Sequence, residues 1–157
     1  MSPEQLAALE GVASEGQEAA RASLPDDPVL APLRAHDPVA LLQLLEEQVR
    51  TMGLSGFVME RMPQMNDVVG QAWSCGGLQV YEEHLYTECV QQLLRVQIAL
   101  LPDPGPARPR VLLATLPEES HGLGLLMAHA LLALEGCACT SLGVRVPAQQ
   151  LVAACTA

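Results

Sequence analysis

The chain has 157 residues, 50% of them hydrophobic, and its 18 acidic and 8 basic residues give a formal net charge of -10. All the basic residues are arginine, which excludes Schiff-base and pyridoxal chemistry and the lysine of a phosphate-binding loop. Because direct nucleic-acid binding needs a basic face that displaces counterions, we do not expect this chain to bind DNA or RNA itself.

The hydrophobic runs and the first residues predict a cytoplasmic protein. No apolar run reaches the ~18 residues that a membrane span needs, and the chain does not begin with the basic and then apolar layout of a signal peptide. The five cysteines are odd in number, and Cys137 and Cys139 lie too close together for the usual Cys-x-x-Cys site. We therefore expect the cysteines to be buried small hydrophobic residues.

The first half of the chain has the pattern of helices separated by short breaks. Ser2-Pro3-Glu4-Gln5 is typical of a helix start, with a capping serine and a proline in the first turn. Asp37-Pro38 repeats that signal, and apolar residues at helical spacing then continue as far as Gly53.

Two further helices complete this region. One is expected from about Ser55 to Trp73, with a kink at Pro63 unless the local structure absorbs the lost hydrogen bond. After Gly76-Gly77, the other runs from about Leu78 to Leu101 and carries two apolar stripes, so other helices must surround it. Residues 1–101 are therefore predicted to form an antiparallel four-helix bundle.

We interpret the proline-rich segment 102–109 as a linker. After it, the spacing of the apolar residues changes from the helical pattern to that of a strand. Residues 111–116 form an unbroken apolar run, as expected for a parallel strand covered on both faces. A helix over 123–134, a second strand over 137–142 and a second helix after Pro147 complete the pattern. Residues 110–157 thus predict the first units of a Rossmann-like (flavodoxin-like) α/β domain, with an incomplete sheet.

One candidate site is Glu119-x-His121-x-x-Gly124, in the loop after the first expected strand. Open α/β sheets bind ligands at this edge, and an exposed imidazole there offers a nitrogen to a metal while a carboxylate orients its other nitrogen. Gly122 and Gly124 let the backbone approach a large, flat group. The alternative is a solvated loop histidine beside a helix cap.

A second candidate site is Trp73-x9-Glu83-His84. The Gly-Gly turn brings the end of one helix and the start of the next to one end of the bundle, and tryptophan is a rigid plate suited to covering a flat group. Side chains adjacent on a helix diverge by about 100°, so Glu83 and His84 do not both point at one atom. The alternative is that Trp73 belongs to the core and that Glu83 favours the positive end of its helix.

In this order, the two motifs resemble the cobalamin-binding sensor module of CarH-type, MerR-family light-responsive regulators. There a W-x9-E-H motif lies on a four-helix bundle and an E/D-x-H-x-x-G motif on a Rossmann-like domain. The resemblance also includes the segments 68–73, 77–80 and 82–90, and it covers roughly residues 37–157. It implies a module truncated at both ends, because the chain lacks a basic DNA-binding segment and the later strands of the α/β domain.

The resemblance assigns a role to each motif residue. His121 would be the lower axial ligand of cobalt, held in the loop with Glu119, Gly122 and Gly124. Trp73, Val80 and Glu83 would surround the upper 5'-deoxyadenosyl group of adenosylcobalamin. His84 would lie nearby and take the vacated upper position of cobalt after light removes that group, and protein assembly would change.

Other interpretations remain open. Methylcobalamin or hydroxocobalamin is an alternative cofactor, and a corrinoid protein that carries a methyl group between methyltransferases is an alternative function. A third possibility is an interaction module without a cofactor. We expect no catalytic residues, and a homo-oligomer or a separate regulatory protein as partner. We assign no role to His36, expected at the surface before a helix cap, or to His129.

Overall fold

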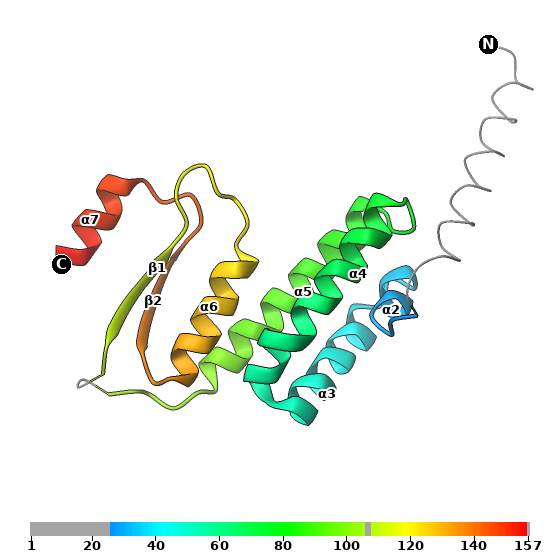
Figure 1. Cartoon of the computed structure of the whole chain (residues 1–157), viewed down its shortest axis with the longest axis horizontal. Coiled ribbons are helices and arrows are strands. Elements are labelled where there is room, and N and C mark those ends of the chain that lie inside the picture. Colours follow the sequence, from blue (N-terminus) through cyan, green and yellow to red (C-terminus); the bar gives the residue numbers. More distant parts are fainter. Residues whose placement is uncertain (1–25, 106–107, 157) are drawn as a thin grey trace, which may run out of the picture. The chain divides into compact units, whose positions relative to one another are not determined.

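The computed structural model describes residues 26–105 and 108–156, which are mostly helical and include one small parallel sheet (Figure 1). The elements, in chain order, are the helices α2 (Leu30–Arg34) and α3 (Pro38–Gly56), the π-helical segment η1 (Phe57–Arg61), the helices α4 (Met62–Ser74) and α5 (Val80–Ala99), strand β1 (Arg110–Ala114), helix α6 (Leu123–Leu134), strand β2 (Ala138–Gly143) and helix α7 (Ala148–Thr156). The helix start expected at Ser2 lies outside the described residues.

The described residues divide into two compact units, and the division falls within α3 and α5. The first unit contains residues 26–44 and Glu60–Cys89, and the second contains Leu45–Met59 and residues 90–156. The first unit is entirely helical. The second adds the two strands, α6 and α7 to the remaining helical turns.

The helical part follows the expected breaks. Gly53 has φ +75° and ψ 163°, so the helical path stops there, as the sequence predicts, although α3 as a whole extends to Gly56. Pro63 lies in the first turn of α4, directly after η1. The wider π-helical turn supplies the local structure that accommodates the missing donor and the bulk of the proline ring.

The core of the helical part consists of fully buried aliphatic and sulfur-containing side chains with one phenylalanine. In the first unit these include Leu33, Leu41, Met62, Met65 and Ala72, and in the second Leu45, Phe57, Val58, Val90 and Leu94. Both apolar stripes of α5 are buried in the middle of the helix. Towards its end one stripe is exposed, at Val96 and at Leu100 just after the helix, and the other is half-buried at Ile98 and Leu101.

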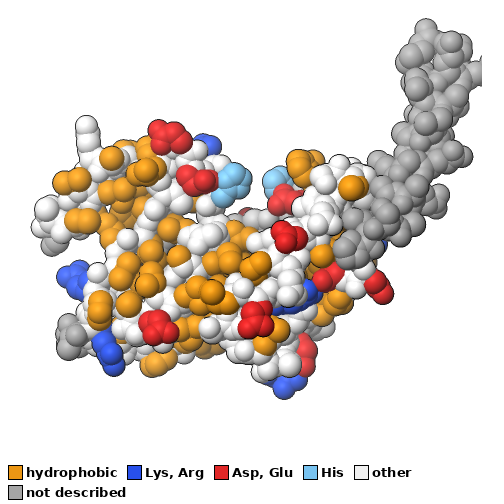
Figure 2. Space-filling view, viewed as in Figure 1, with side chains coloured by type: hydrophobic (Ala, Val, Ile, Leu, Met, Phe, Trp, Pro, Cys, Tyr) orange, Lys and Arg blue, Asp and Glu red, His pale blue; other side chains and the backbone are white. Residues whose placement is uncertain are grey.

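Strands β1 and β2 are parallel neighbours, as the strand, helix, strand pattern predicts (Figure 1). The expectation that the first strand is covered on both faces is wrong for the described residues. Of the β1 side chains only Leu113 is buried, whereas Val111 and Leu112 are half-buried. Helix α6 packs on the two strands, and most of its apolar side chains remain half-buried; Figure 2 shows such apolar side chains on the surface.

The cysteines differ in how far they are buried. Cys89 is buried as expected, but Cys137 and Cys139 are half-buried, and Cys75, which caps the end of α4, and Cys155, in α7, are exposed. In the part of the chain that the structure describes, no helix has both the length and the apolar character needed to cross a membrane.

Candidate functional site

The loop between β1 and α6 carries His121, and Nδ1 of its ring contacts the carboxylate of Glu119. Nδ1 of His121 lies 2.6 Å from Oε1 of Glu119, and the backbone N–H of His121 donates to the same oxygen over 2.7 Å. The His121 side chain is 90% exposed. Within the described residues no group bonds Nε2, so the carboxylate fixes the ring and leaves Nε2 open to a ligand.

Hydrogen bonds to Thr115 hold this loop against the end of β2. The Thr115 hydroxyl donates to the carbonyl of Glu119 over 2.7 Å and accepts from the backbone N–H of Arg145 over 3.0 Å. Gly122 follows directly and caps α6. A Cβ atom at Gly122 would meet the side chain of Val144 at 3.2 Å, whereas Gly124 faces open space, so only Gly122 is limited by close packing.

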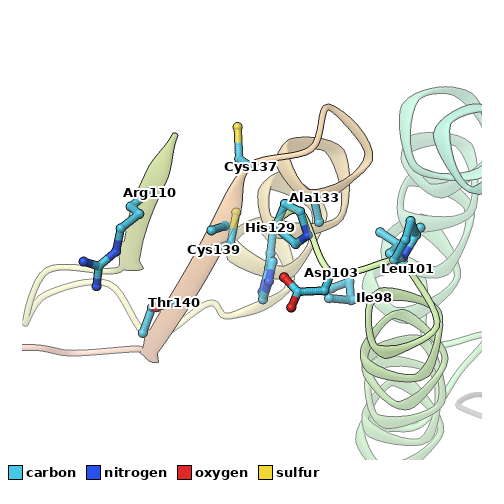
Figure 3. Close-up of a pocket in the computed structure, with 12 residues that line it drawn as sticks. Ile98, Leu101, Asp103, Arg110, His129, Ala133, Cys137, Cys139 and Thr140 are labelled. Carbon is cyan, nitrogen blue, oxygen red and sulfur yellow. The ribbon is translucent and has the colours of Figure 1, made fainter. Parts of the chain in front are cut away.

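The described residues of the second unit line at least two cavities. One, of about 560 Å³, borders the motif loop at Ser120 and Gly122 and is also lined by residues of α5, α6 and β2. The other, of about 300 Å³, contains His129, Cys137 and Cys139 but no motif residue (Figure 3). Burial lowers the pKa of His129, which therefore favours its neutral form in this setting.

Trp73 lies next to the turn that joins α4 to α5. The backbone N–H groups of Gly77 and Leu78 both donate to the carbonyl of Ala72, and Gly76 has φ +71°, a conformation that glycine adopts readily. Leu78 is buried and anchors the turn, whereas Trp73 is 52% exposed. Trp73 is therefore not part of the helical core, and its ring is accessible to a ligand.

The first turns of α5 bring the other predicted residues of this motif onto one side of the helix. Successive helical residues turn by about 100°, so four side chains lie within a sector of about 100° around the helix axis. These are Val80, Glu83, His84 and Thr87. The Thr87 hydroxyl donates to Oε1 of Glu83 over 2.9 Å, and Nδ1 of His84 lies 3.4 Å from Oε2 of Glu83. Val80 and His84 are exposed and Glu83 is half-buried, so this side is open to a ligand.

Sequence reasoning missed the pair formed by His36 and Glu82. Glu82 is 3% exposed, its Oε1 lies 3.1 Å from Nε2 of His36, and its Oε2 accepts the backbone N–H of Gln79 over 2.6 Å. Glu82 thus occupies the capping-box position three residues after Gln79. Only the acidic residue of that signature is present, since Gln79 replaces the usual serine or threonine. The sequence also does not indicate that His36 lies next to Glu82 in the fold.

Each motif contains one exposed histidine beside a carboxylate. The described residues contain no group of three or more His, Cys, Asp or Glu side chains that could hold a metal ion. A cobalt ion inside a corrin takes its equatorial nitrogens from the macrocycle and needs one protein ligand below it. A single imidazole oriented by a carboxylate fits that requirement, and an exposed tryptophan beside an apolar and carboxylate-bearing helix face fits a large upper ligand.

The described residues combine helices with a parallel α/β unit whose loop presents a histidine held by a carboxylate. The chain is 36% identical over 126 residues to the HTH-type transcriptional repressor CarH of Myxococcus xanthus. The alignment covers 78% of this chain and 40% of that repressor, so the chain spans less than half the length of this relative. No protein-family model matches the chain.

Proposed function

We propose that this chain is a cobalamin-binding, light-sensing module of a transcriptional regulator. The similarity to a CarH repressor supports a regulatory role. The observation that carries the cobalamin assignment is the orientation of His121, whose Nδ1 is bound by Glu119 while Nε2 is open. The alternative is a solvated loop histidine, which would bind no cofactor.

In this proposal the two motifs would hold different parts of the cofactor. His121 would bind cobalt through Nε2, and Glu119 would keep its ring in the tautomer that leaves Nε2 unprotonated. Trp73 and Val80 would pack against the 5'-deoxyadenosyl group, and Glu83, held by Thr87, would accept hydrogen bonds from it. When bound, adenosylcobalamin supplies a cobalt–carbon bond that light breaks, so that the upper group leaves.

The response to light would then arise from the helices. Trp73 and Val80 would lose packing when the bulky group leaves, and the conformation that those contacts stabilised would no longer be favoured. His84, whose Nδ1 lies near Glu83 and whose ring is exposed, would then offer Nε2 to cobalt in place of that group. The assembly of the protein, with itself or with a partner regulator, would change as a consequence.

Reconstitution with adenosylcobalamin in the dark tests the function directly. The purified chain should retain the cofactor through desalting, and green light should change both its absorption spectrum and its hydrodynamic size. His121→Ala should lose the cofactor or the spectrum of a histidine-bound cobalt, and His84→Ala should change only the spectrum after illumination. A colourless wild-type protein after desalting, or a coloured protein that does not respond to light, would contradict the proposal.

Methylcobalamin and hydroxocobalamin distinguish the sensor from a methyl carrier. A sensor built around Trp73 and Glu83 should bind adenosylcobalamin more tightly than either of these smaller cofactors. Rapid transfer of a methyl group from bound methylcobalamin to a thiolate acceptor, which forms a thioether and leaves the cobalt–carbon electron pair on cobalt as cob(I)alamin, would instead identify the carrier.

A further inference from the structure

Glu82 is a buried carboxylate whose two oxygens are both bound. Among the residues that the structure describes, it is the one charged side chain that is almost completely withdrawn from solvent, at 3% exposure. Its oxygens meet Nε2 of His36 and the backbone N–H of Gln79. An unpaired carboxylate would be costly in such a place, so these partners allow Glu82 to remain there.

His36 occupies a backbone position that glycine would fill more easily. It has φ +53° and directly follows the last turn of α2. Its N–H donates to the carbonyl of Leu33, and the N–H of Asp37 donates to that of Pro32. This is the Schellman arrangement, in which the left-handed residue is most often glycine. Because a histidine here carries a backbone cost, its imidazole is expected to contribute elsewhere.

The imidazole of His36 contacts the first turn of α5 at two adjacent residues. Besides its bond to Glu82, the ring meets the Tyr81 ring edge-on, with the centroids 5.1 Å apart and an interplanar angle of 77°. Glu82 lies on the side of α5 opposite to Val80 and His84, since successive residues turn by about 100°. His36 therefore contacts the first turn of α5 on the side of Glu82, and the side that carries Val80 and His84 stays exposed.

We propose that His36 and Glu82 are positioning residues for the side of α5 that carries Val80, Glu83 and His84. The role of that side as the upper-ligand site rests on the proposed function. His36 and Glu82 would not touch the ligand. They would set the axial position and rotation of the first turn of α5, and so the place at which Glu83 meets the ligand.

Amide hydrogen exchange in the ligand-free protein tests the structural part of this inference. His36→Gly removes the imidazole and suits the left-handed backbone, so the fold should be retained. We expect the hydrogen-bonded amides of Gln79, Glu82 and Glu83 to exchange on the order of fivefold faster in His36→Gly, the effect of one lost hydrogen bond, and about tenfold faster in Glu82→Ala, the effect of a lost cap.

Two variants serve as matched comparisons. His36→Gln places an amide donor within reach of Glu82 and should restore slow exchange. Glu88→Gln removes an exposed carboxylate from the same helix and should leave the exchange of the first turn unchanged. Equal exchange in His36→Gly and the wild type would overturn the positioning role.

Affinity for two cobalamins tests the functional part. His36→Gly should weaken binding of adenosylcobalamin on the order of fivefold and change hydroxocobalamin binding less than about twofold, since only the larger upper ligand reaches α5. Equal weakening of both would indicate a general folding effect and overturn the inference. If the wild type binds neither cobalamin, the proposed function fails and the ligand role of this turn falls with it, while the exchange data still decide whether His36 positions α5.

Discussion

At the scale of single residues, one carboxylate oxygen of Glu119 sets the direction of the proposed cobalt ligand. It meets both the backbone N–H and Nδ1 of His121. The backbone N–H of His121 and then its side chain lower the pKa of Glu119 below its usual value of 4.5. The carboxylate is therefore ionised throughout the neutral and mildly acidic range and keeps its hold on the ring.

Glu119→Ala should weaken cobalamin binding by roughly 10-fold to 100-fold, the range found when the partner of a metal-bound histidine is removed. A titration followed by absorption spectroscopy measures this change. Glu118→Ala is the matched control, because Glu118 is an adjacent, exposed carboxylate. Equal affinities of the Glu119→Ala and Glu118→Ala proteins would show that Glu119 does not orient the ligand.

The pKa of Glu119 gives a separate prediction in the ligand-free protein. Because its folded pKa is lowered, the contact with His121 should be complete above pH 4.5 and should be lost as the pH falls through the lowered value. NMR titration of the Glu119 side chain should show this, and the pKa should rise in His121→Ala. An unchanged pKa in that variant would mean that the two residues do not interact in solution.

At the scale of elements, glycine and proline positions determine where the helices break. Gly53 is a position where the sequence alone identifies the break, because only glycine adopts φ +75° without strain. The position of α2 was not predicted, since Leu30–Arg34 is too short to show periodicity. The His36–Glu82 pair was not predicted either, because it joins residues 46 positions apart.

Gly53→Ala should lower the free energy of unfolding by about 1–2 kcal/mol, because alanine is strained in the left-handed region. Gly70→Ala is the matched control within α4. The added Cβ has no atom within 4 Å there, and the better helix propensity of alanine should raise stability by up to about 1 kcal/mol. Urea denaturation measures the free energy of unfolding of both variants. A change of the same sign in the two would contradict this account of the break at Gly53.

The first unit is also held by a two-pronged ion pair between Asp27 and Arg61, with nitrogen–oxygen distances of 2.7 and 2.8 Å. Burial tends to raise the pKa of Asp27, but the hydrogen bonds from Arg61 and from the backbone N–H of Val29 outweigh it, and the pKa lies below its usual value. The pair should therefore stabilise the fold at neutral pH and lose its effect only in strong acid.

Arg61→Ala should lower the free energy of unfolding by about 3 kcal/mol at pH 7, since it leaves a largely buried carboxylate without its charged partner. Arg50→Ala breaks the exposed pair with Glu47 and should change stability far less. Thermal or urea unfolding at pH 7 compares the two. Similar losses of unfolding free energy in the two variants would show that burial of the Asp27–Arg61 pair does not increase its contribution to stability.

At the scale of the whole molecule, the residues of the two motifs fall in different units. Trp73, Glu83 and His84 belong to the first, and Glu119 and His121 to the second. The motifs and the order of elements were evident in the sequence because helical period, strand period and turn residues are local signals. The half-buried state of α6 and β1 was not, because burial depends on which other elements cover them.

Cobalt itself gives the most direct test of the central claim. Adenosylcobalamin bound to His84→Ala, which lacks the second histidine that the proposal brings to cobalt after light, is photolysed without oxygen, and the electron paramagnetic resonance spectrum of the resulting cobalt(II) centre is recorded from protein with ¹⁴N-histidine and with ¹⁵N-histidine. If the lower ligand is His121, each cobalt line should be a triplet with ¹⁴N and a doublet with ¹⁵N, and the doublet should disappear in His121→Ala. A triplet that persists with ¹⁵N-histidine would show that the cofactor keeps its own base and that His121 does not bind the cobalt.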